Sequence, residues 1–413
     1  KCGLPSSPAL VLRALAGQRR GVLILDQIDA LRLTSAHSHE AWAAFLEFVG
    51  DALADAGTTV IAACRSFDLE NDPSITAWKR DLTKTKTAVV EVQVGVLPDA
   101  AVADVLRPFG VEFAGLPARQ KTLLTQPNAL ALWKALAIVG RVPANADNVI
   151  HLMREFIDVR QKEAVHEHAV QESDVACVLS TLVRYLDSHG QLDAPDGILR
   201  DRRMALDALC SVGLLSREDG TLAFTHQSYF DYLLAEQVLV AATQGGQDPI
   251  TWVRANQSLF RRDQLRQLLC LFRDCDPHRH AALLRSLLLD DGIRFHLRHL
   301  ALGLLRQADP VLDHEAELVI ELCRDATWFE RILPEIFWAR PPWFDALVGH
   351  GALNGWLADS ENEQRVRQVL RFLRSVAKTR GEQIDDLLAP YWGAGGKWDD
   401  RLIELFSFNP CDD

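Results

Sequence analysis

The sequence predicts a mostly helical protein that begins with a small α/β unit. Two short apolar runs, at 22–25 and 60–64, have the length and composition of buried strands, and a helical pattern separates them. Strand, helix, strand on this scale is typical of a parallel sheet. From about residue 98 onward, nearly every apolar pattern has the spacing of a helix.

The first segment, 1–97, is expected to hold the α/β unit. Between its two strands, apolar residues follow the helical spacing i, i+3, i+4, i+7 and i+11, which predicts one buried helix face. These residues are Trp42, Phe45, Leu46, Val49 and Leu53. The run AVVEVQV at 88–94 predicts a third strand that closes the segment.

The next two segments are expected to be separate domains. Segment 98–170 is helical throughout, with a proline at 127 at the start of an apolar helix. Segment 171–243 has two helical patterns, then two short apolar runs around Asp219 and Gly220, which predict a β-hairpin. Helix, helix, hairpin, helix is the order of a winged-helix domain.

The last segment, 244–413, is expected to be an α-solenoid. Its helical patterns present leucines on one face and arginines on the other, and Asp-Pro, Asp-Gly or Gly breaks separate them. Stacked helix pairs of this kind predict a HEAT-like repeat region. Solenoids recognise partners by shape, so this segment is the expected sensor of a partner.

Composition narrows the class of protein. With 413 residues, 48% hydrophobic and 24% charged, the chain is expected to fold into several domains. The formal net charge of -12 argues against a general polyanion binder, so we expect no nucleic-acid partner. No apolar run reaches the ~18 residues of a membrane span, and the first residues lack the order of a signal peptide. We therefore expect a cytoplasmic protein without membrane contact.

The eight cysteines are scattered and are expected to be reduced. One stretch, CLFRDCDPHRH, brings Cys270, Cys275, His278 and His280 close together in sequence, which raises a zinc interpretation. Its spacing fits no common structural zinc motif, and Cys270 falls on the apolar face of an expected helix. A plain helical segment is the favoured interpretation.

The candidate chemistry lies where the two predicted strands end, because open parallel sheets bind ligands at the carboxyl ends of their strands. Asp26 follows the first apolar run, where its carboxylate can hold Mg²⁺ through a bound water. Asp29 is the candidate to orient or deprotonate the attacking water. The alternative is that Asp26 only caps the following turn.

Arg65 follows the second apolar run. A guanidinium at this point carries a fixed fork of donors toward the same sheet edge, which suits the terminal phosphate of a nucleotide. The alternative is an ion pair with an acidic residue of the loop that follows. Those acidic residues are Asp68, Glu70 and Asp72.

Four motifs in this order resemble the STAND class of signal-transducing P-loop NTPases, especially the NACHT-like bacterial proteins linked to antiviral defence. They are LILDQIDAL for the magnesium strand, AACRSFDLENDP for the sensor strand, TQPNALAL for a helical lid and AFTHQSYFDYLLAE in the winged helix. The resemblance implies a partial P-loop NTPase sheet in 1–97, a lid in 98–170, and ATP or ADP with Mg²⁺ as ligands.

The resemblance also assigns two binding residues. It implies that Pro127 packs against the adenine and that His226 contacts the β-phosphate of ADP in a closed resting state. The alternatives are a plain helix-start proline and a core histidine beside Phe224 and Tyr229.

The chain departs from this family because no GxxxxGK[ST] phosphate loop (Walker A) occurs in the sequence. The family's sheet order would also place a strand between the sensor strand and 88–94, and its lack would leave unpaired backbone groups on both sides. We therefore expect an N-terminally incomplete part of a longer protein, or a degenerate NTPase. Either would bind nucleotide weakly on its own.

The favoured functional hypothesis is a nucleotide-dependent signalling switch in bacterial defence. A protein trigger on the C-terminal helices opens it, and the open form assembles into homo-oligomers. ATP hydrolysis is expected only if the full-length protein has the phosphate loop. The alternative is a non-hydrolysing helical-repeat scaffold with a degenerate NTPase core. A third hypothesis, a DNA-reading winged helix, is disfavoured because acidic residues offset its basic cluster of Arg200, Arg202 and Arg203.

Overall fold

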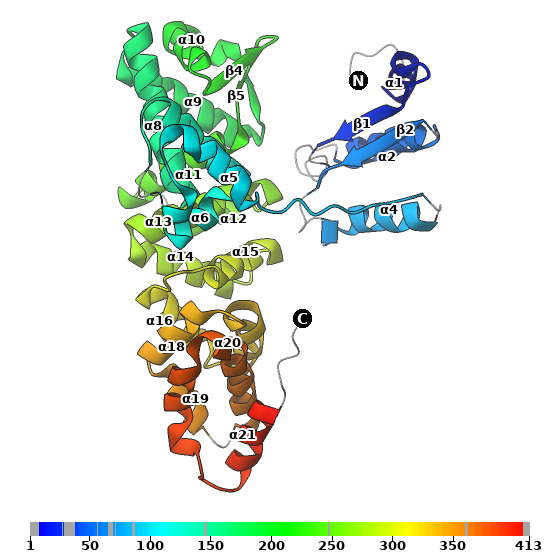
Figure 1. Ribbon diagram of the computed structural model, residues 1–413. Helices are drawn as coiled ribbons and strands as arrows, with labels where there is room; N and C mark the ends of the chain where they lie inside the picture. Colours follow the sequence, from blue (N-terminus) through cyan, green and yellow to red (C-terminus); the bar gives the residue numbers. More distant parts are fainter. Residues whose placement is uncertain are drawn as a thin grey trace. The chain divides into compact units, whose positions relative to one another are not determined.

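The computed structural model is mostly helical, with two small sheets (Figure 1). It describes residues 8–26, 28, 38–55, 57–64, 69–70, 72–84, 87–143, 146, 148–246, 248–359 and 362–407. Contacts divide the chain into two compact units. The first comprises Lys1–Leu234 with Ser258–Phe260, and the second comprises Ala235–Gln257 with Arg261–Asp413.

The first unit begins with a parallel pair of strands, as the sequence predicts. Strand β1 (Gly21–Leu25) pairs with β2 (Thr58–Ala62) in the register Gly21 to Thr58 and Leu25 to Ala62. The predicted helix between them is confirmed as α2 (Ser38–Leu53). Among its described residues this segment also contains α1 (Pro8–Ala16) and α4 (Pro73–Lys84).

An aromatic core holds this α/β segment together. Trp42 and Phe45 stack with ring centroids 4.8 Å apart, and Trp78 of α4 meets Phe45 edge to face at 5.3 Å. Val49 and Ile75 are buried beside them. The predicted face of α2 is therefore confirmed at Trp42, Phe45 and Val49, whereas Leu46 is exposed.

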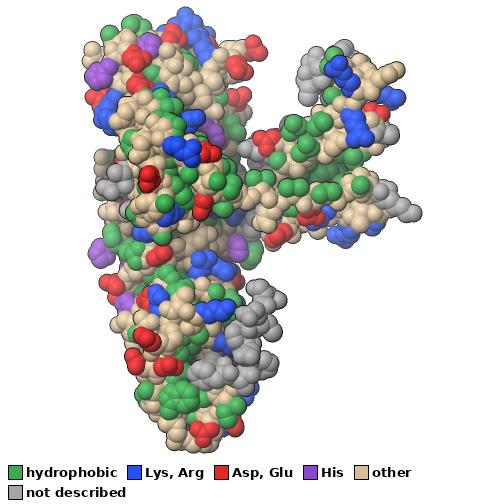
Figure 2. Space-filling view, viewed as in Figure 1, with side chains coloured by type: hydrophobic (Ala, Val, Ile, Leu, Met, Phe, Trp, Pro, Cys, Tyr) green, Lys and Arg blue, Asp and Glu red, His purple; other side chains and the backbone are tan. Residues whose placement is uncertain are grey.

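The third strand expected at 88–94 is wrong. Residues 87–98 have no regular secondary structure. Val90, Val92 and Val94 are 83%, 79% and 88% exposed, and apolar side chains lie uncovered along this segment (Figure 2). Alternating valines favour a strand only where a neighbouring strand supplies hydrogen bonds, and the described strands β1 and β2 pair only with each other.

Helices follow, as the sequence predicts for 98–170. Their bounds are α5 (Asp99–Leu106), α6 (Ala118–Leu124), α7 (Pro127–Ile138) and α8 (Val149–His168). Buried apolar side chains, including Leu106, Trp133 and Leu136, fill the space between them. Helix α8 begins at an N-cap, because the Asn148 side chain accepts a hydrogen bond from the backbone N–H of His151.

The hairpin predicted around Asp219 and Gly220 is confirmed. It follows α9 (Glu172–His189) and α10 (Arg203–Ser211), and α11 (Gln227–Thr243) follows it. Strands β4 (Leu215–Glu218) and β5 (Thr221–Phe224) join through Asp219 and Gly220, whose φ angles are 48° and 78°. Two positive φ angles are what a tight hairpin turn requires. No sequence pattern predicted β3 (Asp193–Pro195), which pairs with β5 to complete a three-stranded antiparallel sheet.

Helices make up the second unit. They are the part of α11 from Ala235 onward, α12 (Pro249–Ala255), most of α13 (Leu259–Cys275), α14 (Pro277–Leu289), α15 (Phe295–Arg306), α16 (Asp313–Leu322), α17 (Ala326–Ile332), α18 (Pro341–Gly349), α19 (Ala352–Ala358), α20 (Glu363–Leu388) and α21 (Lys397–Ser407). Alternate helices contact one another, since α14 contacts α12 and α16, and α18 contacts α16 and α20. Helices that alternate along the chain therefore pack side by side and form one stack (Figure 1).

Polar links between helices that are not consecutive in the chain recur at similar sequence separations, with one further link between α20 and α21. Arg254 donates a hydrogen bond of 2.7 Å to Asp290, which is 36 residues further along the chain. Arg380 donates two hydrogen bonds of 2.7 Å to Asp345, which lies 35 residues before it. Similar links join Arg273 to Glu315, Arg285 to Glu321, Gln364 to Glu330 and Arg401 to Glu363. The exposed ion pairs among them, such as Arg285 with Glu321, contribute at most about 1 kcal/mol each. The links thus fix the register of helices that apolar burial holds together.

Truncating the buried Trp343 of α18 should destabilise the second unit. Its side chain is fully buried, and its indole N–H donates to the carbonyl oxygen of Leu305 at 2.8 Å. We expect Trp343→Ala to lower the free energy of unfolding by about 3–5 kcal/mol, because a cavity forms and a carbonyl loses its partner. Urea unfolding followed by circular dichroism measures this loss. Trp338→Ala, at a tryptophan that is 45% exposed, is the matched control, and equal losses in both variants would contradict the packing described.

Candidate functional site

The carboxyl ends of β1 and β2 lie side by side. The backbone N–H of Ala63 donates to the carbonyl of Leu25 at 2.8 Å, and the N–H of Ile28 donates to the carbonyl of Ala63 at 3.0 Å. The two backbone segments therefore stay hydrogen-bonded just beyond the ends of the strands. Asp26 lies between these two bonds, next to the segment that leads from Ala63 and Cys64 into Arg65.

The Asp26 side chain is exposed. Among the described residues, none forms a hydrogen bond or ion pair with its carboxylate. Asp29 and Arg65, the other two residues predicted at this edge, lie outside the described residues. Their catalytic and phosphate-binding roles remain predictions, as does the Mg²⁺ site at Asp26.

Pro127 occupies the first position of α7, which confirms it as a helix-start proline. Gln126 is the N-cap residue, and the Pro127 ring is exposed at the helix end. A proline is well placed here, since its missing N–H would have no partner inside the helix. An exposed ring is compatible with the predicted adenine contact, which stays a prediction.

His226 lies in the turn between β5 and α11, and the alternative of a core histidine is wrong because the residue is exposed. The backbone N–H of Ser228 donates to Nδ1 of His226 at 3.2 Å, and the Ser228 hydroxyl lies 2.7 Å from the same atom. A ring nitrogen that accepts a backbone hydrogen bond carries no proton. With Nδ1 as the acceptor, the proton of the neutral ring lies on Nε2.

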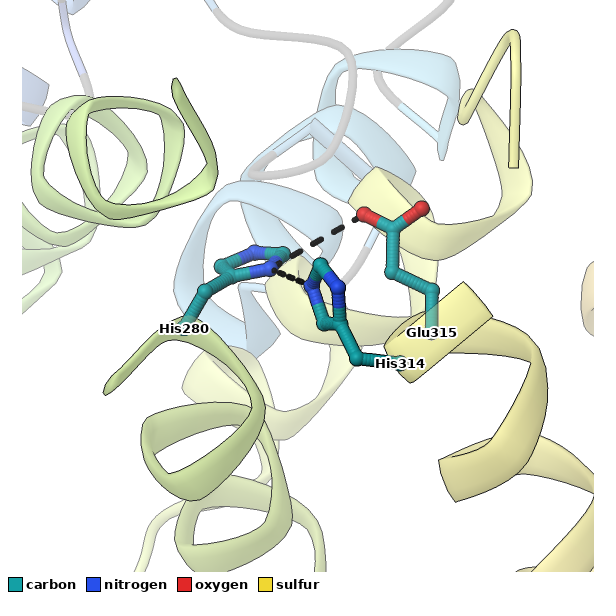
Figure 3. Close-up of side chains that lie close together, drawn as sticks. All are labelled: His280, His314 and Glu315. Atoms are coloured by element: carbon teal, nitrogen blue, oxygen red, sulfur yellow. Dashed lines mark hydrogen bonds and ion pairs between the residues drawn. The ribbon is translucent and has the colours of Figure 1, made fainter. Parts of the chain in front are cut away.

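A second cluster lies in the second unit and joins α14 to α16 (Figure 3). Nδ1 of His280 and Nε2 of His314 are 2.8 Å apart, and Nδ1 of His280 is 3.9 Å from Oε1 of Glu315. All three donor atoms lie within 4.8 Å of one another. His280 and Glu315 are only 4% and 2% exposed, and His314 is half-buried.

Arg273 orients the acidic member of this cluster. Its Nε donates to Oε1 of Glu315 at 2.6 Å, and its Nη2 donates to Oε2 at 3.1 Å. The backbone N–H of Leu312 also donates to Oε2 at 2.9 Å, which caps the first turn of α16. This bidentate pair, with Glu315 buried and Arg273 partly buried, holds the carboxylate in one orientation.

Burial keeps both imidazoles neutral. Loss of water lowers the pKa of His280 from 6.5 to about 4, and Glu315 only partly offsets this effect. Burial also lowers the pKa of His314. Two neutral imidazoles at 2.8 Å share one hydrogen bond, in which one ring donates and the other accepts.

The cysteines do not take part in this cluster. Burial raises the pKa of the Cys270 thiol to about 11, so it stays protonated in α13, and Cys275 is exposed. Of the sequence stretch that raised a zinc interpretation, only His280 belongs to the cluster. His314 and Glu315 were missed because they lie on α16, 34 positions or more away in sequence, and no local spacing connects them with His280.

No helix among the described residues combines the length and the apolar character needed to cross a bilayer. No protein-family model matches this sequence, and no curated protein matches it significantly.

Acid should destabilise the protein through His280. Its pKa is about 4 in the folded protein, whereas an unperturbed histidine titrates near 6.5, so the folded protein resists protonation. Its contribution to stability is complete above pH 6.5 and falls as the pH drops toward 4, by up to about 3 kcal/mol. Urea unfolding in EDTA at several pH values measures this loss. Glutamine does not titrate, so His280→Gln should lose less stability than wild type as the pH falls from 6.5 to 4. Identical pH profiles for the two proteins would show that His280 does not cause the loss.

Proposed function

We propose that this protein is a nucleotide-dependent signalling switch of the STAND type, active in bacterial defence. The observation that carries the proposal is the parallel ladder of β1 and β2, which continues past both strands and brings Asp26 beside the segment leading into Arg65. In such a site a carboxylate holds Mg²⁺ and an arginine binds the terminal phosphate of ATP. These ligands and roles are part of the proposal.

The proposal requires a phosphate-binding loop that the printed sequence does not contain. Within this scheme, Asp29 orients the attacking water and Pro127 contacts the adenine. An aspartate reaches less far than a glutamate, so any hydrolysis is expected to be slow. Whether ATP is turned over is thus a separate matter from whether ATP is bound.

His226 supports the switch part of the proposal through its exposure and its fixed ring. Ser228 holds the ring through Nδ1, which leaves Nε2 as the atom proposed to meet a phosphate oxygen. The elements around it, α9, β3, α10, the β4–β5 hairpin and α11, have the order of a winged helix. A histidine on this domain that binds ADP would hold the closed state.

The helices of the second unit are the proposed sensor. Alternate helices contact one another, and polar links recur across about 36 positions, which favours a HEAT-like solenoid of stacked helix pairs. Such stacks expose long surfaces that fit a protein trigger. We propose that binding there opens the protein and promotes homo-oligomers in the cytoplasm.

A helical-repeat scaffold is the second candidate function. The lack of a GxxxxGK[ST] loop in the printed sequence favours it, because the helices could bind a partner without any nucleotide. The two functions differ in one measurable property, since only the switch couples partner binding to the bound nucleotide.

Nucleotide binding by the protein expressed from its complete reading frame separates the two functions. We expect the complete protein to bind a fluorescent ADP analogue and the printed chain to bind it at least about tenfold more weakly. Asp26→Ala should reduce Mg²⁺-dependent ATP binding in the complete protein. Glu47→Ala, an exposed carboxylate on α2, is the control. A complete protein that binds no nucleotide would leave the scaffold as the function.

His226→Ala should weaken the closed state of the complete protein. A hydrogen bond to a charged phosphate contributes about 1.5–3 kcal/mol, so its loss should raise the open fraction roughly ten- to a hundredfold. Mass photometry in ADP would detect this as an increase in oligomers. His166→Ala, at an exposed histidine of α8, should behave as wild type. If His226→Ala and wild type give the same distribution in ADP, His226 does not hold the switch closed.

A further inference from the structure

We propose that His280, His314 and Glu315 form a Zn²⁺ site that joins α14 to α16. Their donor atoms are two neutral imidazole nitrogens and one carboxylate oxygen, all within 4.8 Å. Two histidines and a glutamate are a ligand set that zinc accepts, with a fourth position left for water. This site is independent of the nucleotide and of the proposed switch.

The distances fit a tetrahedral ion after small movements. Zinc–nitrogen bonds of about 2.0–2.1 Å place two tetrahedral ligand atoms about 3.3 Å apart. The observed separations of 2.8 Å, from His280 to His314, and 3.9 Å, from His280 to Glu315, lie on either side of that value. Changes of about 0.5 Å in these two separations, and of up to about 1.5 Å between His314 and Glu315, whose donor atoms lie within 4.8 Å, convert the hydrogen-bonded cluster into a metal-bound one.

The carboxylate has one acceptor position left for the ion. A carboxylate offers about four lone pairs. Oε2 of Glu315 accepts from Leu312 and Arg273, whereas Oε1 accepts only from Arg273. Oε1 is also the oxygen nearer to His280. Arg273 and Leu312 thus act as positioning groups that hold Oε1 toward the two imidazoles, as outer partners of metal ligands commonly do.

The surrounding charges select the class of metal. Arg273 and the amino ends of α14 and α16 are positive, which opposes cations that bind by charge alone. Mg²⁺ and Ca²⁺ also need several oxygen ligands, and the cluster supplies a single carboxylate. Imidazole nitrogens favour Zn²⁺ and its transition-metal neighbours. The site therefore discriminates by ligand chemistry, and a bound ion would lock two successive layers of helices together.

Zn²⁺ titration of the complete, metal-stripped protein tests the site. Calorimetry without nucleotide should detect one zinc ion per chain, and excess Mg²⁺ should not compete with zinc for this site. His314→Gln, at the half-buried ligand, should weaken the affinity for Zn²⁺ more than about tenfold, since it removes a direct ligand. Zinc should also raise the melting temperature of wild type and not that of His314→Gln.

Three controls address surface binding and misfolding. His278→Gln changes an exposed histidine two residues from His280 and should bind Zn²⁺ as wild type does. The Co²⁺-loaded protein should show tetrahedral bands without a thiolate charge-transfer band, because no cysteine contributes. Circular dichroism checks that His314→Gln is folded. Unchanged zinc affinity in folded His314→Gln, or zinc binding lost in Cys275→Ala, would overturn the proposal.

Discussion

Burial of apolar helix faces against neighbouring helices is the interaction on which most of this structure depends. Apolar transfer contributes about 25 cal/mol per Å² of buried area and has no preferred direction. It therefore gathers α12 to α20 into a stack without fixing their register. The register of the helices is set by polar links between them. Arg380 forms two bonds with Asp345, 35 positions away, and the indole N–H of Trp343 donates to Leu305, 38 positions away.

The polar cluster on α14 and α16 illustrates how such a stack accommodates buried charge. Glu315 is 2% exposed, and an isolated buried carboxylate would cost several kcal/mol. Arg273 and the N–H of Leu312 remove that cost, and the histidines remain uncharged beside them. A fixed carboxylate facing two neutral imidazoles is a consequence of this arrangement. The same arrangement that stabilises the helix ends thus prepares a ligand set for a metal.

The α/β segment depends on a different constraint, the parallel ladder between β1 and β2. The ladder continues through Ala63 and Ile28, so backbone hydrogen bonds still join the two segments just beyond both strands. The sheet nevertheless has few strands, and Val22, Ile24 and Ile61 are at least half exposed. Its core rests on α2 and α4 instead, through their packed aromatic rings.

The sequence by itself determined the local elements, because helix and strand spacing, helix-start prolines and the Asp219–Gly220 turn act over a few neighbouring residues. It failed at 88–94, where alternating valines predict a strand that no described neighbour pairs with, and it could not foresee β3. Asp26 at the end of β1 was predictable from the apolar run before it. The exposure of His226 and the meeting of His280 with His314 and Glu315 were decided only by the tertiary structure. Their cause is packing between residues distant in sequence, for which no local pattern exists.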